Sequence, residues 1–160
     1  MTAPCPRTET RHASTRTAGW RAAWRAVAAL VLGFAGGLCQ AGVPGLAGSY
    51  YNNTSLTGTP ALTRTDSTVA FNWSTGSPGS GVNTDGFSVR WTGFVRVATT
   101  GSYNFQTVSD DGVRLYVNNL LVINNWTVHG PTTDTSAAIT LTAGTTVPIT
   151  VDVDDTRRVR

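Results

Sequence analysis

The sequence predicts an all-β domain, an antiparallel β-sandwich or barrel, that begins near position 42. Apolar and polar residues alternate with a period of two from Phe87 to Trp91, and again on both sides of a polar turn between Tyr103 and Val117. Turns rich in Gly, Asn and Thr separate these short runs, and no segment after position 42 shows helical periodicity. Many short strands joined by such turns are typical of sandwiches and barrels.

We expect residues 1–41 to be a secretory signal peptide. Five arginines against one glutamate precede an apolar run from Ala26 to Leu38. A membrane-spanning helix needs about 20 apolar residues, more than this run has, and the residues Cys39-Gln40-Ala41 would suit cleavage before Gly42. The alternative is an amphipathic N-terminal helix, because Trp20 and Trp24 are four positions apart. Export would make residues 42–160 a secreted or surface-exposed domain without stable membrane insertion.

The composition of residues 42–160 excludes two classes of function. The whole chain has a net charge of +3, but the part after the leader has seven arginines against eight aspartates. Nucleic acid is therefore not an expected partner, because phosphate binding needs a basic face. This part also has no Glu, Lys or Cys and a single His, so acid-base catalysis would depend on aspartates alone. We predict that the domain is not an enzyme.

The first half of the domain alternates strands with two polar loops. We expect a first strand around Leu46–Tyr50, a short strand at Thr68–Trp73 and a longer strand at Phe87–Trp91 that continues past Gly93. Gly93 suggests a bulge or a close approach of another segment. The intervening loops, Asn52–Pro60 and Ser74–Gly86, are rich in Gly, Asn, Thr and Pro, and the second is long enough to carry function.

The second half is organised around a three-stranded meander from Tyr103 to Trp126. Its first turn is Ser109-Asp110-Asp111-Gly112, and its second turn is Asn118-Asn119. Leu120 to Ile123 is a short apolar run, which we expect to be a fully buried strand. Two further strands are expected around Ile139–Leu141 and Val147–Val153.

These motifs resemble the PA14 family, a β-rich module of toxins, glycosidases, proteases and adhesins. The match runs from about Gly45 to Val153 and comprises Gly48–Asn52, Phe87–Gly93, Ser109–Leu115, and Asn125-Trp126 followed by His129-Gly130-Pro131. The resemblance implies two packed antiparallel sheets. In the family a glycine-rich loop and a closing strand follow the strand that matches Val147–Val153, whereas here the sequence is Asp154-Asp155-Thr156-Arg157-Arg158-Val159-Arg160. Either the sequence is C-terminally incomplete or one sheet edge is left open.

The adjacent carboxylates of Asp110 and Asp111 are the candidate metal ligands. One interpretation is a solvated turn, since Asp and Gly are favoured in turns for backbone reasons. The other is a calcium site, because Ca²⁺ takes six to eight oxygen ligands. Neighbouring side chains on a strand point to opposite faces, so the backbone must bend for both to reach one ion. The resemblance implies a cis Asp110-Asp111 peptide and further ligands at or beyond Asp154, where Asp154 or Asp155 could substitute.

The predicted function is that of a calcium-assisted carbohydrate-binding module of a larger secreted protein, with glycans or extracellular polysaccharide as partners. Trp126 is the candidate for stacking on a sugar, whereas Trp91 is expected in the core and His129 in a loop-fixing hydrogen bond. The alternatives are a structural or protein-interaction module, or a fragment of a glycoside hydrolase. The last is disfavoured, because two adjacent Asp in one turn do not flank a sugar well.

Overall fold

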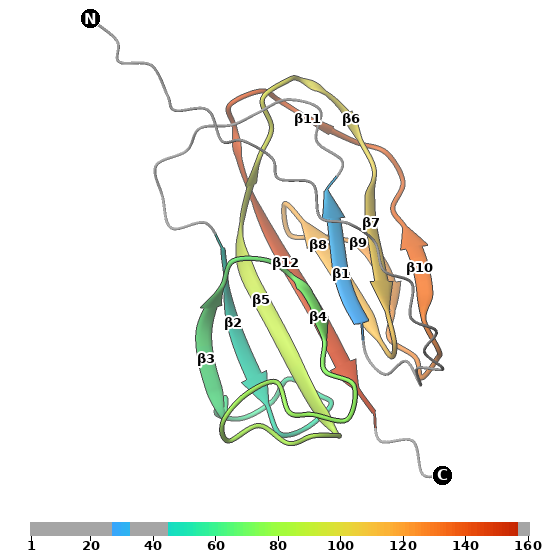
Figure 1. The fold of residues 1–160 in the computed structure, drawn as a ribbon. Coiled ribbons are helices and arrows are strands. Elements are labelled where there is room, and N and C mark those ends of the chain that lie inside the picture. The colour runs from blue at the N-terminus through green and yellow to red at the C-terminus, as the bar shows by residue number, and fades with distance from the viewer. Residues whose placement is uncertain (1–26, 33–44, 157–160) are drawn as a thin grey trace, which may run out of the picture.

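The computed structural model describes residues 27–32 and 45–156, which form an antiparallel β-sandwich (Figure 1). Every strand pair is antiparallel, and the sheets do not close on themselves, so the architecture is a sandwich rather than a barrel. The prediction of an all-β fold is confirmed. In these residues there is no helix, and so none long and apolar enough to cross a bilayer.

The larger sheet has six strands in the order β3-β2-β5-β12-β8-β9. Its members are β2 (Leu46–Tyr51), β3 (Leu62–Asp66), β5 (Phe87–Arg96), β8 (Val113–Val117), β9 (Leu120–Asn125) and β12 (Thr146–Asp155). The last strand, β12, lies inside this sheet and pairs with β5 on one side and β8 on the other. It is therefore not an open edge.

The smaller sheet has four strands in the order β10-β7-β1-β4 and faces the larger one in Figure 1. Its members are β1 (Val27–Leu32), β4 (Ala70–Asn72), β7 (Phe105–Ser109) and β10 (Thr132–Thr135). Two short strands, β6 (Gly101–Tyr103) and β11 (Ile139–Leu141), pair with each other at one end.

The strand β1 comes from the segment that the sequence assigns to the leader. Its backbone pairs with β4 from Val27 to Ala29 and with β7 from Ala29 to Leu32. An uncharged apolar run suits a buried strand as well as a signal peptide, and periodicity cannot distinguish the two. Export and cleavage stay predictions, because residues 1–26 and 33–44, which include the expected cleavage site, lie outside the described residues.

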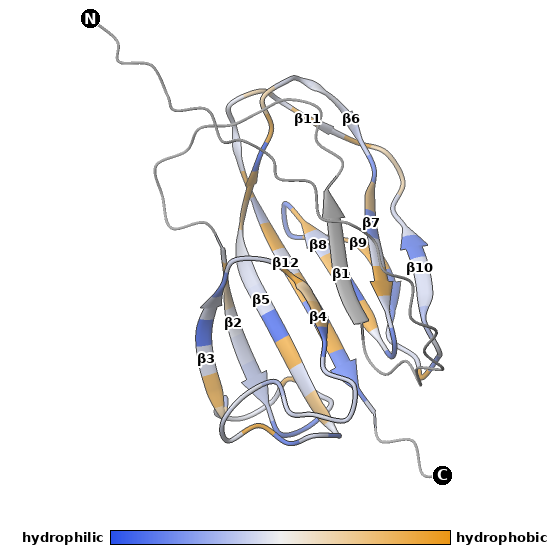
Figure 2. Ribbon diagram, in the orientation of Figure 1, coloured by the Kyte–Doolittle hydropathy of each residue, from blue (hydrophilic) through white to orange (hydrophobic). Residues whose placement is uncertain are grey.

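The core fills the space between the two sheets. Trp91 is fully buried, as the sequence predicts, and its ring stacks on Phe71 of the opposite sheet with centroids 5.7 Å apart. Phe71 stacks in turn on Trp73 at 5.1 Å. Figure 2 shows the alternation behind this packing, with hydrophobic bands along β5, β8 and β12. Gly93 faces Leu46 so closely that a Cβ would overlap its side chain, which confirms the expected close approach.

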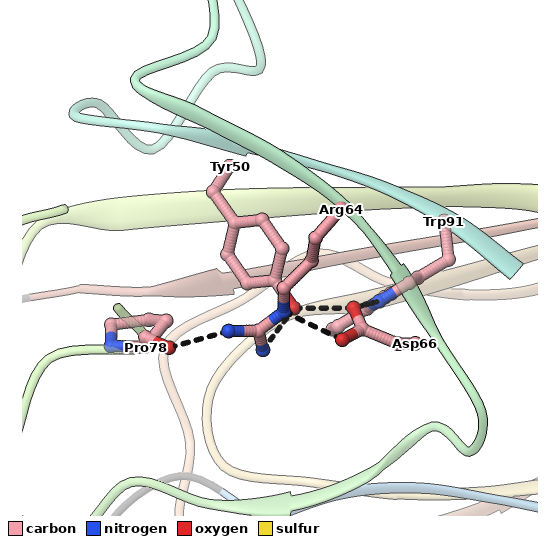
Figure 3. A network of polar contacts seen from close by, with 5 residues as sticks. All are labelled: Tyr50, Arg64, Asp66, Pro78 and Trp91. Atoms are coloured by element: carbon pink, nitrogen blue, oxygen red, sulfur yellow. Dashed lines mark hydrogen bonds and ion pairs between the residues drawn. The ribbon is translucent and has the colours of Figure 1, made fainter. Parts of the chain in front are cut away.

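A buried carboxylate, that of Asp66, ties three strands together (Figure 3). It accepts hydrogen bonds from the Tyr50 hydroxyl at 2.5 Å, from Trp91 Nε1 at 2.7 Å and from Arg64 Nε at 2.6 Å. Burial and the bond to Asp66 raise the pKa of Tyr50, which keeps the phenol a donor. The sequence alone does not reveal the role of Asp66, because its three donors come from β2, β3 and β5 and meet only in the fold.

The prediction of a fully buried strand at Leu120–Ile123 is wrong in one respect. The segment is a strand, β9, but Leu120 is 67% exposed and Leu121 is 46% exposed. Only Ile123 is buried there. The reason is position, because β9 forms an edge of the larger sheet and pairs only with β8. The Asn118-Asn119 turn is confirmed, with both residues at positive φ.

Candidate functional site

The turn between β7 and β8 places two carboxylates at one end of the sandwich. The peptide bond between Asp110 and Asp111 is cis, as the family resemblance implies. Asp110 is 8% exposed and Asp111 is 3% exposed, so the carboxylates are buried and the turn is not a solvated one. Buried charges are found where partners or ions compensate them.

Two backbone N–H groups from distant segments bind the carboxylate of Asp111. Oδ1 accepts from His129 N at 3.2 Å, and Oδ2 accepts from Thr156 N at 3.0 Å. The His129 ring is fixed by a contact of 2.8 Å between Nδ1 and the Gly130 carbonyl, which confirms the expected role of His129 in its loop. Asp111 thus holds together the turn, the loop after Trp126 and the end of β12.

Asp154 brings a third carboxylate to the turn from β12. Its backbone N–H donates to the Gly112 carbonyl at 3.1 Å, and its Oδ2 accepts from the Thr156 hydroxyl at 2.8 Å. Its Oδ1 is buried and has no hydrogen-bond partner among the described residues. Burial raises the pKa of Asp154, the negative charge of Asp111 raises it further, and the hydrogen bond from Thr156 opposes the shift.

Gly112 lies where neighbouring atoms leave no room for a side chain. A Cβ at this position would overlap Asp154 Oδ1 and would lie 3.2 Å from the Trp126 Cα. The turn and the end of β12 can therefore approach each other only with glycine here. The Ser109 hydroxyl, next to the turn, is a second buried oxygen without a hydrogen-bond partner in the described part of the chain.

Of the two other candidates from the sequence, Trp126 borders this site at Gly112, and Asp155 follows Asp154 at the end of β12. Trp126 is half-buried, and the guanidinium carbon of Arg114 lies 4.2 Å from its ring centroid, a cation-π arrangement. One face of the indole is thus covered by Arg114. Asp155 is half-buried, and its backbone carbonyl accepts a hydrogen bond from Gly86 at 2.9 Å.

The chemistry of this arrangement is that of a hard cation site. Asp110, Asp111 and Asp154 supply carboxylate oxygens, the ligands that Ca²⁺ prefers. A carboxylate oxygen has two lone pairs, so the N–H bonds to Asp111 do not exclude an ion. Across residues 27–32 and 45–156, however, no three Asp, Glu, His or Cys side chains are arranged closely enough to hold a metal ion. The residues present fit calcium in type, and Asp154 Oδ1 lies against Gly112 of the same turn.

The sequence could not reveal the backbone donors of His129 and Thr156. A backbone N–H leaves no signature in the residue type, and both donors are far from Asp111 along the chain. The contact between Asp154 and Gly112 could not be predicted from local patterns either. The signal for Asp154 was the family resemblance, which places further ligands at or beyond this position.

Comparisons with known proteins agree with this architecture. The chain is 38% identical over 117 residues to the anti-sigma-I factor RsgI3 of Acetivibrio thermocellus, a match that covers 73% of this chain and 18% of that protein. It is 35% identical to a solved anti-sigma factor domain-containing protein from Clostridium clariflavum, with a TM-score of 0.66 over 77% of this chain and 43% of that one. The chain thus spans less than half the length of either relative.

A third likeness concerns the fold alone. The PA14 sugar-binding domain from an RTX adhesin has a TM-score of 0.51 at 20% identity, covering 72% of this chain and 85% of that domain. The family model of the PA14 domain matches residues 42–157. The chain therefore belongs to the PA14 domain family.

Proposed function

We propose that this PA14 domain is a secreted carbohydrate-binding module in which Asp110, Asp111 and Asp154 hold a calcium ion that accepts sugar hydroxyls. The observation that carries the proposal is the meeting of Asp154 with the Asp110-Asp111 turn, where Asp154 Oδ1 is buried without a hydrogen-bond partner in the described residues. A buried, unpaired carboxylate oxygen is costly unless a cation or a donor completes it.

The role of calcium follows from the chemistry of the ligand. A neutral sugar offers hydroxyl groups, which compete poorly with water for protein hydrogen bonds. An ion held by three carboxylates has coordination positions left, because Ca²⁺ takes six to eight oxygens. Two adjacent hydroxyls can fill two of these positions together. The existence of a sugar-binding domain with this fold supports the proposal.

Calcium titration of the full chain by isothermal calorimetry tests the ion site. We expect binding with a Kd of about 10⁻⁴ M to 10⁻³ M, the range of extracellular calcium modules. Asp110→Ala and Asp111→Ala should each abolish it. The matched control is Asp134→Asn, which removes a carboxylate from β10 that accepts from Asn125 Nδ2 at 3.0 Å and is not in the turn. No heat of binding at millimolar calcium would refute the proposal.

Glycan binding needs its own test. The full chain is screened on a glycan array in calcium chloride and again in EDTA. Glycan binding that is lost in EDTA and in Asp111→Ala supports calcium-assisted recognition. Glycan binding that neither change affects would show that the glycan does not bind through the ion.

A second candidate function is a module of a regulatory protein that makes protein contacts and needs no sugar. The 38% identity to an anti-sigma factor favours it. In that case the turn would serve only to hold the end of β12, and the chain would bind neither calcium nor any glycan of the array.

A further inference from the structure

We propose that the outer face of the six-stranded sheet carries a second carbohydrate-binding groove that holds a neutral polysaccharide chain without calcium. The groove has a volume of about 360 Å³ and is lined by Arg90, Thr92, Tyr116, Asn119 and Thr150. Its residues come from β5, β8, β12 and the β8-β9 turn, and none belongs to the Asp110-Asp111 turn.

The pairing of strands places these side chains together. Thr150 lies opposite Thr92 on one side and opposite Tyr116 on the other. The adjacent row has Asp152 opposite Arg90. The inward neighbours along the strands are buried in the core, so these two rows face away from it. A site on paired strands is held more rigidly than one on loops, and this lowers the entropy cost of binding.

Arg90 and Asp152 form the floor of this face as a fixed, neutral pair. Arg90 Nε and Nη2 each donate to one oxygen of Asp152 at 2.7 Å. Asp152 is completely buried, whereas the Arg90 side chain remains 43% exposed. The bidentate pair fixes the guanidinium plane and leaves further N–H groups on it, since arginine has five. Because Asp152 compensates the charge of Arg90, this pair suits the hydroxyls of a neutral ligand better than an anion.

The remaining lining residues suit a sugar ring. Tyr116 is half-buried and offers a flat apolar ring with a polar tip, which matches the apolar face of a pyranose and its hydroxyl rim. Thr92 and Thr150 add hydroxyls that both donate and accept, and Asn119 adds an amide at an exposed turn. One aromatic ring among four polar side chains suits a ligand that is rich in hydroxyl groups.

The same face continues toward a second aromatic residue. Asp152 lies opposite Arg114 on β8, and the Arg114 guanidinium lies over the ring of Trp126. Tyr116 and Arg114 are two positions apart on one strand and so share this face. Aromatic rings at both ends of a row of polar groups favour an extended polymer over a single terminal sugar.

The test is affinity electrophoresis of the full chain in EDTA, through gels that contain xyloglucan, galactomannan, hydroxyethyl cellulose or, as a charged comparator, polygalacturonate. We expect retardation by at least one neutral polymer. Tyr116→Ala should weaken the affinity about tenfold, the effect of losing a stacking contact worth about 1.4 kcal/mol. Tyr103→Ala is the matched control, because Tyr103 is a half-buried tyrosine of β6, outside the six-stranded sheet, and does not line the groove.

Asn119→Gly is a second variant of the groove, which keeps the test valid if Tyr116→Ala does not fold. Glycine keeps the positive φ of the turn, at 62° in Asn119, and removes only the amide. It should weaken binding as well. Absence of retardation by any neutral polymer in EDTA would overturn the inference, as would retention by polygalacturonate alone or wild-type affinity in both variants.

These outcomes are separable from those of the proposed calcium site. Binding that needs calcium and is lost in Asp111→Ala, but is unchanged in Tyr116→Ala, would leave the calcium module standing and reject the groove. Polymer binding in EDTA that is lost in Tyr116→Ala, with no heat of calcium binding, would support the groove and reject the calcium module.

Discussion

The backbone N–H of Thr156 donates a hydrogen bond of 3.0 Å to Oδ2 of Asp111, across 45 positions of sequence. This bond joins the end of the last strand to the turn that carries the paired carboxylates. Together with the bond from Asp154 N to the Gly112 carbonyl, it makes the geometry of the turn depend on β12. Changes in β12 should therefore be felt at the candidate ion site.

Gly112→Ala should destabilise the domain and abolish calcium binding. The added Cβ would overlap Asp154 Oδ1 and crowd the Trp126 backbone, so the turn and β12 must separate. We expect a loss of about 1–3 kcal/mol in the free energy of unfolding, as for other overpacking substitutions. Urea denaturation measures it. Gly130→Ala is the control, because a Cβ there would meet no atom within 4 Å, and an equal loss in both variants would contradict the argument.

The contribution of Asp154 to the stability of the calcium-free domain should fall as pH rises above the ordinary Asp value of 3.8. Burial raises the pKa of Asp154, so between 3.8 and the raised pKa the folded state keeps a proton that the unfolded state has lost. Unfolding then releases a proton, and rising pH favours it until the raised pKa is passed. The measurement is the free energy of unfolding from about pH 4 to pH 7 in EDTA.

Asp154→Asn isolates that contribution, since the other carboxylates titrate in both proteins. The difference in stability between the variant and the wild type should grow across the same window and then level off. Calcium should stabilise the wild type at neutral pH more than the variant, because the amide oxygen of Asn is a ligand without a negative charge. Parallel pH profiles for the two proteins would show that Asp154 does not carry this dependence.

Asp66→Ala should be among the most damaging single substitutions in the fold. It removes the acceptor of three donors, from Tyr50, Arg64 and Trp91, and leaves the Arg64 charge without its carboxylate. The buried donors of Tyr50 and Trp91 would lose their acceptor, which costs about 1–3 kcal/mol for each. Thermal denaturation should show this loss, whereas Thr63→Ala, at an exposed position of the same strand, should change stability by less than about 0.5 kcal/mol. Similar melting temperatures for the two variants would exclude the network as a major source of stability.

Deletion of residues 1–41 distinguishes a cleaved leader from a strand of the mature sandwich. If β1 belongs to the sandwich, the deletion should lower stability or cause aggregation. The strand β1 lies between β4 and β7, and without it both strands expose unpaired backbone groups inside the smaller sheet. Such edges pair with other chains. Comparison of residues 42–160 with the full chain by thermal denaturation and light scattering tests this. If the shorter protein is monomeric with an unchanged melting temperature, β1 is dispensable for the sandwich.

The sequence by itself determined the fold class, most strand positions and the two carboxylates of the turn. Period-two alternation places Phe87, Val89 and Trp91 on one face whatever lies opposite, because successive side chains of a strand point to opposite sides. The turn of Asp110 and Asp111 follows from local residue types, and the cis bond between them followed from the family resemblance.

Tertiary structure alone decided which strands are neighbours and what surrounds each polar group. The exposure of Leu120 depends on β9 being an edge, and the burial of Asp66 and Asp152 depends on donors from other strands. The approach of Asp154 to Gly112 depends on β12 lying beside β8. These contacts join residues far apart in the chain, and local patterns contain no information about pairing across such distances. The same limit applies to Val27–Leu32, whose apolar residues suit export and a sheet interior equally well.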